Sequence, residues 1–151
     1  MAPPHGRLVC FQDEKSTDLA VCLANSSLFY WFYSAFSDCE HINDRLIRGF
    51  YIPPHWEDTD WTTLSRRLSK NIDLNSARKT ISTKQGHTIE YLEINAMKSK
   101  SIIDEIDRVL AKHYGFTAEE LDFIPSTLLR AGINYDNKYR MGRNSGSDDG
   151  E

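Results

Sequence analysis

The chain has 151 residues, of which 40% are hydrophobic and 26% are charged. This balance argues against disorder of the whole chain, and the length predicts one compact unit rather than two substantial domains. A formal net charge of -4 argues against a free-standing, non-specific nucleic-acid binder, which normally presents a basic surface. Any contact with DNA must therefore use a local patch.

The amino-terminal residues contain no basic region followed by an apolar core, so no secretory signal is predicted and the cytoplasm is the expected compartment. We expect residues 1–6 to form a Pro-rich arm and residues 7–12 a short strand. The three cysteines, Cys10, Cys22 and Cys39, form no Cys-x-x-Cys pair and are odd in number. They are therefore predicted to be buried free thiols rather than disulfide partners or zinc ligands.

The apolar stretch 19–36 has about the length that a membrane-spanning helix requires. Polar residues 25–27 lie at its centre, however, and aromatic residues fill its second half rather than its ends, which is not typical of a membrane span. We therefore predict a helix over residues 18–37, capped by Ser16 or Asp18 and buried on most sides, with no membrane contact. The neighbours that such a helix needs could belong to another domain.

The middle of the chain predicts a mixture of helix and strand. Residues 40–49 are expected to form a short helix or turn, followed by an edge strand over residues 50–52 before a double proline. The spacing of apolar residues predicts an amphipathic helix over 59–75. Residues 79–84 and 87–94 alternate around Gln85-Gly86 and predict a β-hairpin, which places Ile89 and Tyr91 on one face.

Residues 99–113 carry the clearest helical pattern, with a stripe of isoleucines and Gly115 placed to end the helix. Thr117 and Glu120 fit a capping box that opens a further helix, which Pro125 is expected to interrupt early. The polar tail 143–151 is expected to be disordered, so that residues 1–142 form the folded region. The predicted class is α+β, mainly helical with a short antiparallel β-hairpin.

The sequence contains no phosphate-binding loop, no Gly-x-Ser-x-Gly elbow and no His-Glu-x-x-His helix, and its histidines are scattered. No catalytic, cofactor or metal site is therefore predicted in this chain. Asp104, Glu105 and Asp107 resemble the carboxylates that bind magnesium in nucleases. We favour a solvated helix face for them, because Lys100 and Arg108 lie four residues either side of Asp104. A small nuclease using Asp104 and Asp107 stays open as an alternative.

Two short segments combine polar and cationic residues that could contact nucleic acid. The first contains Asn43, Arg45 and Arg48, which could touch phosphates or bases, although surface arginines on a turn have the same pattern. The second is Lys138-Tyr139-Arg140, where two cations flank an aromatic ring. Packing of Tyr139 on the core is the alternative interpretation of that segment. These residues are the predicted DNA-binding set.

The run SIIDEIDRVLAKHYGFTAEELDFI, followed by INYDNKYRMG, resembles the C-terminal end of bacterial adenine-specific DNA methyltransferases of the type II restriction-modification class. Upstream, LANSSLFYWFYSAFSDCEHINDRLIRGFYIP resembles a segment of the C-terminal target-recognition region in the same proteins. Together the matches cover residues 23–52 and 101–142. The sequence departs from the family at residues 125–132, which are inserted between the two parts of the second match.

In that family the catalytic domain flips an adenine out of the duplex and methylates it, while the recognition region helps to choose the sequence. The family's Asn-Pro-Pro-aromatic catalytic motif and its methyl-donor pocket have no counterpart here. Pro53-Pro54 cannot stand in for the motif, because Ile52 precedes it and His55 follows it. The resemblance therefore implies a target-recognition fragment that contacts double-stranded DNA beside a methyltransferase domain or subunit. That partner would hold S-adenosylmethionine and perform methylation, with or without endonuclease activity, whereas this chain alone is not expected to be an enzyme.

A second hypothesis belongs to a different class of function. The aromatic helix 18–37 could instead serve a non-catalytic protein–protein interaction module, because a large exposed apolar surface usually marks an interface. Phosphate contacts weaken steeply with salt and hydrophobic association does not, so salt dependence separates the two hypotheses.

Overall fold

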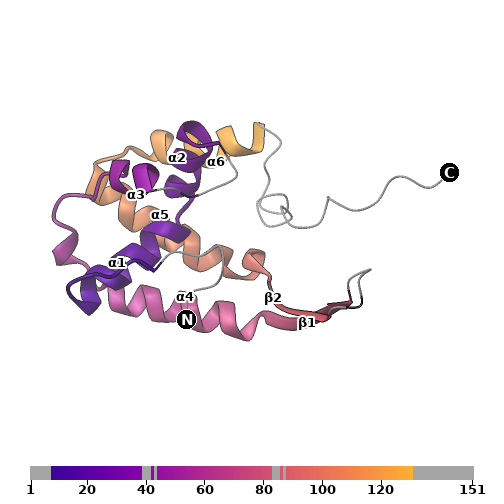
Figure 1. Cartoon of the computed structure of the whole chain (residues 1–151). Helices are drawn as coiled ribbons and strands as arrows, with labels where there is room; N and C mark the ends of the chain where they lie inside the picture. Colours follow the sequence, from indigo (N-terminus) through magenta and orange to yellow (C-terminus); the bar gives the residue numbers. More distant parts are fainter. Residues whose placement is uncertain (1–7, 39–41, 43, 83–85, 87, 131–151) are drawn as a thin grey trace.

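The computed structural model describes residues 8–38, 42, 44–82, 86 and 88–130, with side chains described as far as residue 124. This part of the chain is mainly helical with a two-stranded antiparallel sheet, which confirms the predicted α+β class (Figure 1). The predicted arm 1–6, the predicted tail 143–151 and the inserted residues 131–132 lie outside the described residues.

The aromatic region forms two helices, so the prediction of one helix over 18–37 was wrong. α1 spans Glu14–Asn25 and is capped by Asp13, whereas α2 spans Ser27–Phe36, and the two are bent by 65°. Ser26 produces the break, because its Oγ donates to the Leu23 carbonyl and accepts from the first turn of α2. Among the described residues no single helix is long and apolar enough to cross a membrane; only this bent pair passes that test jointly.

Neither of the two extra strands predicted from sequence is present. Residues 8–13 are exposed and form no strand. The sheet of the described residues has only the two strands of the hairpin, and residues 8–13 do not pair with either of them (Figure 1). The short helix predicted in residues 40–49 is confirmed as α3, Asp44–Gly49. The segment after it runs past the fully buried Pro53 into a 3-10 helix, η1, at Trp56–Asp58. The sheet of the described residues consists of β1 and β2 paired with each other, so residues 50–52 have no neighbouring strand with which to form an edge.

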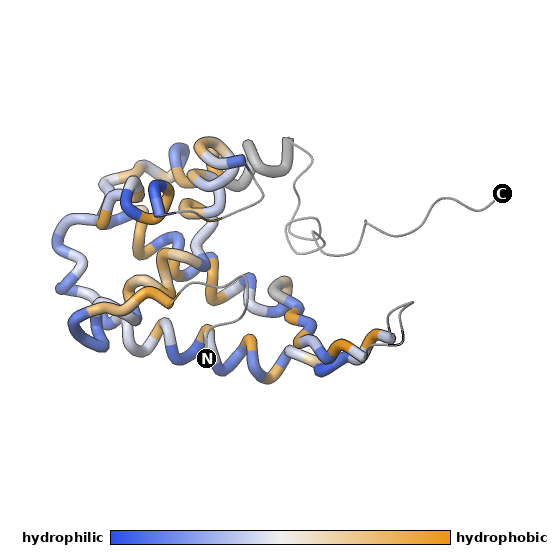
Figure 2. The backbone as a smooth tube through the Cα atoms, viewed as in Figure 1, coloured by the Kyte–Doolittle hydropathy of each residue, from blue (hydrophilic) through white to orange (hydrophobic). Residues whose placement is uncertain are grey.

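The core lies between α1, α4 and α5. α4 spans Trp61–Leu74 and α5 spans Lys100–Tyr114, which confirms both predicted amphipathic helices. Their buried residues contact each other and α1, and hydrophobic and hydrophilic positions alternate along α4 (Figure 2). The buried residues that form this cluster are Leu19, Cys22, Leu23, Trp61, Leu64, Leu68, Ile102, Ile103, Ile106 and Leu110.

The end of α5 and the start of α6 follow the sequence signals closely. Gly115 adopts φ 72°, a left-handed conformation that favours glycine, and ends α5 as predicted. The Thr117 N–H donates to Glu120 Oε2 at 2.8 Å and the Glu120 N–H donates to Thr117 Oγ1 at 3.2 Å, which confirms the capping box. α6 then spans Ala118–Arg130, so the prediction that Pro125 interrupts it early was wrong. A proline inside a helix removes one hydrogen bond and can be absorbed as a kink.

The predicted hairpin is confirmed, with β1 at Ser76–Ser82 and β2 at Thr88–Ile94. The strands pair antiparallel, with Lys79 opposite Tyr91 and Ile81 opposite Ile89. It continues directly from the end of α4 and extends away from the helices (Figure 1). A second short 3-10 helix, η2 at Ala96–Ser99, leads from β2 into α5.

Candidate nucleic-acid interface

α3 carries the two predicted DNA-binding residues that the structure describes. Leu46 is buried, whereas Arg45 and Arg48 are exposed. The residue after α3, Phe50, anchors this short helix to α2, with ring centroids 5.1 Å from both Phe29 and Phe32 in edge-to-face geometry. Aromatic pairs of this geometry stabilise a contact beyond the area that they bury. α3 is therefore attached through its apolar side and presents its arginines to solvent.

Arg45 and Arg48 lie three positions apart on α3, so both can project over the same side of the helix. Within the described residues neither guanidinium forms a salt bridge, which leaves both available to a phosphate. Asn43, the third member of this predicted patch, lies outside the described residues. The same is true of Lys138, Tyr139 and Arg140.

A buried carboxylate joins α5 to the start of α2. Asp107 of α5 is 7% exposed and accepts a hydrogen bond of 2.9 Å from the Ser27 N–H at the start of α2. The first N–H groups of a helix lack partners within the helix and favour a negative charge. Asp107 thereby fixes the start of α2 against α5.

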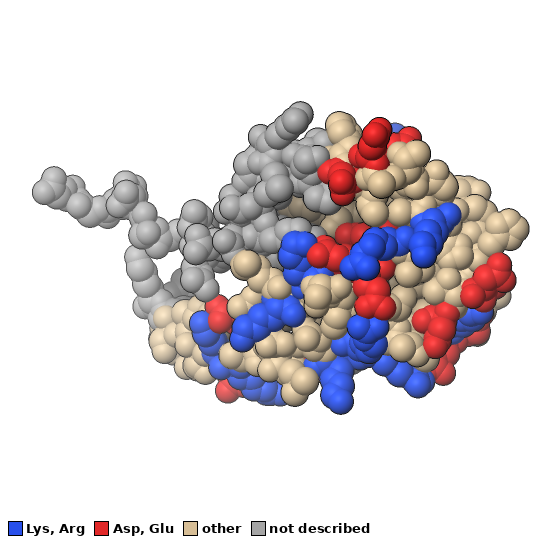
Figure 3. Space-filling view, turned by 180° about the vertical axis from the view of Figure 1, so that it is seen from behind, with Lys and Arg blue, Asp and Glu red and all other residues tan. Residues whose placement is uncertain are grey.

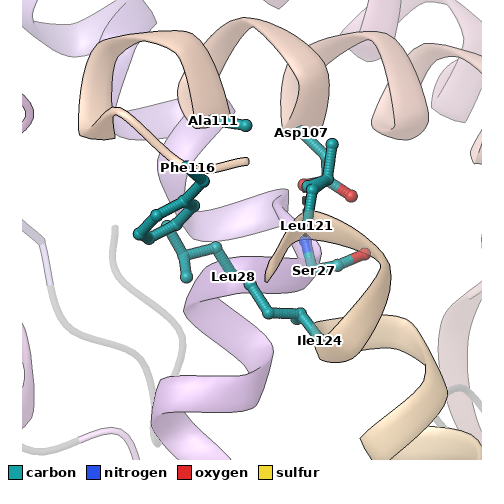
Figure 4. Close-up of a pocket in the computed structure, with 7 residues that line it drawn as sticks. All are labelled: Ser27, Leu28, Asp107, Ala111, Phe116, Leu121 and Ile124. Carbon is teal, nitrogen blue, oxygen red and sulfur yellow. Dashed lines mark hydrogen bonds between the residues drawn. The ribbon is translucent and has the colours of Figure 1, made fainter. Parts of the chain in front are cut away.

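The cavity beside this joint is too small to be a ligand site. Its volume is about 10 Å³, which accommodates about one water molecule. The close-up shows side chains from α2, α5 and α6 converging on it (Figure 4). Its lining residues are Ser27, Leu28, Asp107, Ala111, Phe116, Leu121 and Ile124.

The three acidic residues of α5 do not converge on a common point. Asp104 pairs with Lys100 at 2.6 Å, and Glu105 forms two hydrogen bonds of 2.9 Å with Arg67 of α4. Hydrogen bonding by Arg67 lowers the pKa of Glu105. The predicted solvated face is thus confirmed for Asp104 and Glu105, and wrong for the buried Asp107. Within the described part of the chain, no three His, Cys, Asp or Glu residues are grouped as a metal site.

The surface carries mixed charge rather than one basic field. Figure 3 shows Lys and Arg side chains interleaved with Asp and Glu on the face seen from behind. Several of the basic residues are neutralised by ion pairs, among them Arg66 with Glu14 and Lys79 with Glu93. The described surface seen here therefore offers no extended basic field, in agreement with the net charge of the chain.

An open cleft lies near the start of α4. Its volume is about 490 Å³ and it is rich in carboxylates, which disfavours phosphate binding there. Asp60 in this cleft caps α4, and hydrogen bonds from Thr63 lower its pKa. The remaining lining residues are Glu14, Lys15, Glu57, Asp58, Thr59, Trp61 and Thr62.

His113 at the end of α5 is engaged on both ring nitrogens. Nδ1 lies 3.1 Å from the Pro54 carbonyl oxygen, and Nε2 lies 2.7 Å from Thr59 Oγ1. Because a carbonyl only accepts, Nδ1 is the donor and Nε2 accepts from the hydroxyl in the neutral imidazole. His113 therefore ties α5 to the segment before α4 and is not placed as a free base.

The cysteine prediction was correct for Cys22 and wrong for Cys10. Cys22 is buried in the core, where burial and then the nearby Asp18 raise the pKa of its thiol to about 12. Cys10 is exposed, because the strand expected around it is absent. Cys39 lies outside the described residues.

Sequence reasoning missed the buried polar contacts that position the helices. Asp18 is 8% exposed and accepts from Thr62 Oγ1 at 2.6 Å, which links α1 to α4, just as Asp107 links α5 to α2. The one signal in the sequence for the burial of Asp107 is its place directly after Ile106 of the apolar stripe.

Comparison of the chain with protein-family models, with curated proteins and with solved structures finds no match.

Proposed function

We propose that this chain is a non-catalytic target-recognition part of a restriction-modification adenine methyltransferase, and that it contacts duplex DNA through Arg45 and Arg48. The observation that carries the proposal is the packing of the two family-like segments on each other, which the structure describes through α2 of the first segment and α5 and α6 of the second. Segments far apart in sequence need not meet unless they belong to one structural unit. Their contact supports treating them as a single recognition unit.

The contact between the two segments has both a polar and an apolar part. α2 from the first segment packs against α5 and α6 from the second, and the Ser27–Asp107 hydrogen bond joins the start of α2 to α5. Phe50 then attaches α3 to the outer side of α2. The unit therefore supplies a rigid base for the two exposed arginines, as recognition groups require.

The proposed division of labour leaves the chemistry to a separate methyltransferase domain or subunit. That partner would bind S-adenosylmethionine, flip the target adenine and transfer the methyl group, in the cytoplasm. Arg45 and Arg48 would hold the duplex by its phosphates and edges while the partner acts. Guanidinium groups suit this role because their planar donors match phosphate oxygens.

A matched pair of charge-reversal variants tests the DNA contact. We expect Arg45→Glu with Arg48→Glu to weaken binding to a labelled duplex and to reduce the salt slope by about 2, for two lost phosphate contacts. Arg66→Glu with Lys70→Glu makes the same charge change on the exposed face of α4 and is expected to change binding less. Fluorescence anisotropy over a salt series measures both. Equal losses for the two variants would contradict the assignment to α3.

A second experiment separates recognition from catalysis. The purified chain is incubated with duplex DNA and radiolabelled S-adenosylmethionine, alone and together with a methyltransferase subunit encoded beside it. We expect no label in DNA from the chain alone, and increased transfer or altered sequence preference when both are present. Methylation by the chain alone would overturn the proposal.

The alternative of a protein-interaction module depends on an open aromatic surface, and most of that surface is covered. Phe29 is buried and Phe32 packs between Phe50 and Phe36, so that Phe36, at 68% exposure, is the most open of these aromatic rings. Binding of the chain to another protein without any salt-dependent shift of duplex DNA would favour this alternative.

A further inference from the structure

We propose that the hairpin is a self-association site, at which β2 pairs antiparallel with β2 of a second copy of this chain. The result would be a four-stranded sheet in the order β1-β2-β2-β1. This inference is independent of the proposed DNA contact, which lies on α3.

The hairpin is almost fully exposed although it is rich in apolar residues. Every residue of the two strands is exposed except Ser76 and Glu93, which are partly buried. Figure 2 shows hydrophobic positions along the hairpin, where it extends away from the helices. A two-stranded hairpin is marginally stable in water and usually needs more strands or a packed face. The exposed apolar residues are Ile81, Ile89, Tyr91, Leu92 and Ile94.

The charges of the hairpin favour a protein over DNA as the occupant. Cross-strand pairs share a face, so the Lys79–Tyr91 face also carries Glu93, and the Arg78–Leu92 face also carries Glu90. A ribbon inserted into a DNA groove would bring one of these carboxylates close to phosphates, whichever face it used. Lys79 is in addition neutralised by Glu93 at 2.6 Å.

The two edges of the hairpin differ in their suitability for pairing with themselves. β1 contains the consecutive cations Arg78 and Lys79, and charged side chains of this kind are a usual protection against edge-to-edge pairing. β2 reads TIEYLEI, which is rich in residues with high strand propensity. The outer edge of β2, to which no other described strand is paired, is therefore the better template for a second copy.

β2 can pair with its own copy without opposing like charges when the two-fold axis passes through Tyr91. Tyr91 then lies opposite its own copy, Glu90 lies opposite Leu92, and Ile89 lies opposite Glu93. All seven residues overlap in this register and no like charges are opposed. Moving the axis by one residue to Glu90 would place two carboxylates opposite each other, which is destabilising.

The same register joins the apolar faces of the two hairpins. Ile81, Ile89 and Tyr91 share one face of each hairpin, and Tyr91 lies at the strand that becomes central. Across the two-fold axis the two Tyr91 rings lie opposite each other, and each Ile89 is a diagonal neighbour of the other copy's Tyr91, while Glu93 lies directly opposite Ile89. An aromatic cross-strand pair and diagonal apolar contacts both stabilise a sheet.

Analytical ultracentrifugation over a concentration series tests the proposal with charge variants. We expect a monomer–dimer equilibrium for the natural chain and at least a tenfold weaker dimer for Leu92→Glu, which opposes the Glu90 carboxylate of the other copy. The same substitution faces Arg78 within its own hairpin, so the hairpin should stay folded. Ser82→Glu adds the same charge on β1 and should leave the equilibrium unchanged. Adding Glu90→Lys to Leu92→Glu should restore the dimer.

Cysteine cross-linking tests the register. In a background with Cys10→Ser and Cys39→Ser, Tyr91→Cys is expected to form a disulfide-linked dimer rapidly, because the two thiols meet at the axis. Lys79→Cys, which lies opposite residue 91 but on β1, should cross-link at least tenfold more slowly. A chain that sediments as a monomer at every concentration, or equal cross-linking at both positions, would overturn the proposal.

Discussion

Asp107 differs from the other acidic residues of α5 because its carboxylate is buried against the start of α2. Asp107→Ala removes the acceptor of the Ser27 N–H and the charge that favours this helix end, so we expect a loss of about 1–3 kcal/mol in the free energy of unfolding. Asp104→Ala, which removes an exposed pair with Lys100, should change it by less than about 1 kcal/mol. Urea denaturation followed by circular dichroism measures both, and equal losses would contradict the structural role of Asp107.

Cys22 provides the pH-dependent prediction at this scale. Burial raises the pKa of its thiol from 9.0 to about 12, so the stability contributed by the neutral thiol is fully present below pH 9 and is lost as the pH rises toward 12. Near neutral pH, in a Cys39→Ser variant, an alkylating reagent should label the exposed Cys10 rapidly and Cys22 only after denaturation. Mass spectrometry of digested protein assigns each label. Rapid native labelling of Cys22 would contradict its burial.

At the scale of elements, the break between α1 and α2 depends on one hydroxyl. Ser26 is fully buried, and its Oγ accepts from the Phe29 N–H at 3.0 Å as the cap of α2. Ser26→Ala should therefore lower the free energy of unfolding by about 0.5–2 kcal/mol, as loss of a helix cap does. Ser69→Ala, on the exposed face of α4, is the control and should change it by less than about 0.5 kcal/mol. An unchanged free energy of unfolding in Ser26→Ala would mean that the bend has another cause.

Local signals in the sequence predicted elements well where they agreed with the tertiary packing. α4, α5 and the hairpin follow their apolar spacing, and the capping box at Thr117 and Glu120 is present. The prediction of a single helix over residues 18–37 failed because Ser26 is compatible with two structural roles. Ser26 can lie within a helix or cap a new one, and only the packing of α2 on α5 and α6 decides between them.

At the candidate site, too, the sequence predicted local exposure but not the packing of one element on another. The exposure of Arg45 and Arg48 could be expected from a polar, basic segment, whereas the contact of α3 with α2 through Phe50 could not. The burial of Asp107 was equally hidden, because charged residues are usually exposed and its partner lies 80 residues away in sequence. Helical spacing specifies which face of an element is apolar, but not which other element will cover it.

At the scale of the whole molecule, the helical body and the hairpin differ in how they are stabilised. The body is built on the shared core of α1, α4 and α5, whereas the hairpin strands pair with each other and are exposed on both faces. Local opening is expected where buried apolar contacts are few. The hairpin should therefore open without unfolding the body, unless a partner covers it.

Two leucines of α4 test this view of the molecule. Leu68 is fully buried in the shared core, whereas Leu74, at the end of the same helix, is 74% exposed. Leu68→Ala should lower the free energy of unfolding by about 2–5 kcal/mol, because it leaves a cavity between helices. Leu74→Ala makes the same change in chemistry and should lower it by less than about 0.5 kcal/mol. Trp fluorescence and circular dichroism, followed in one urea titration, should report coincident transitions for the body. A similar cost for the two substitutions would show that α4 is not the centre of the core.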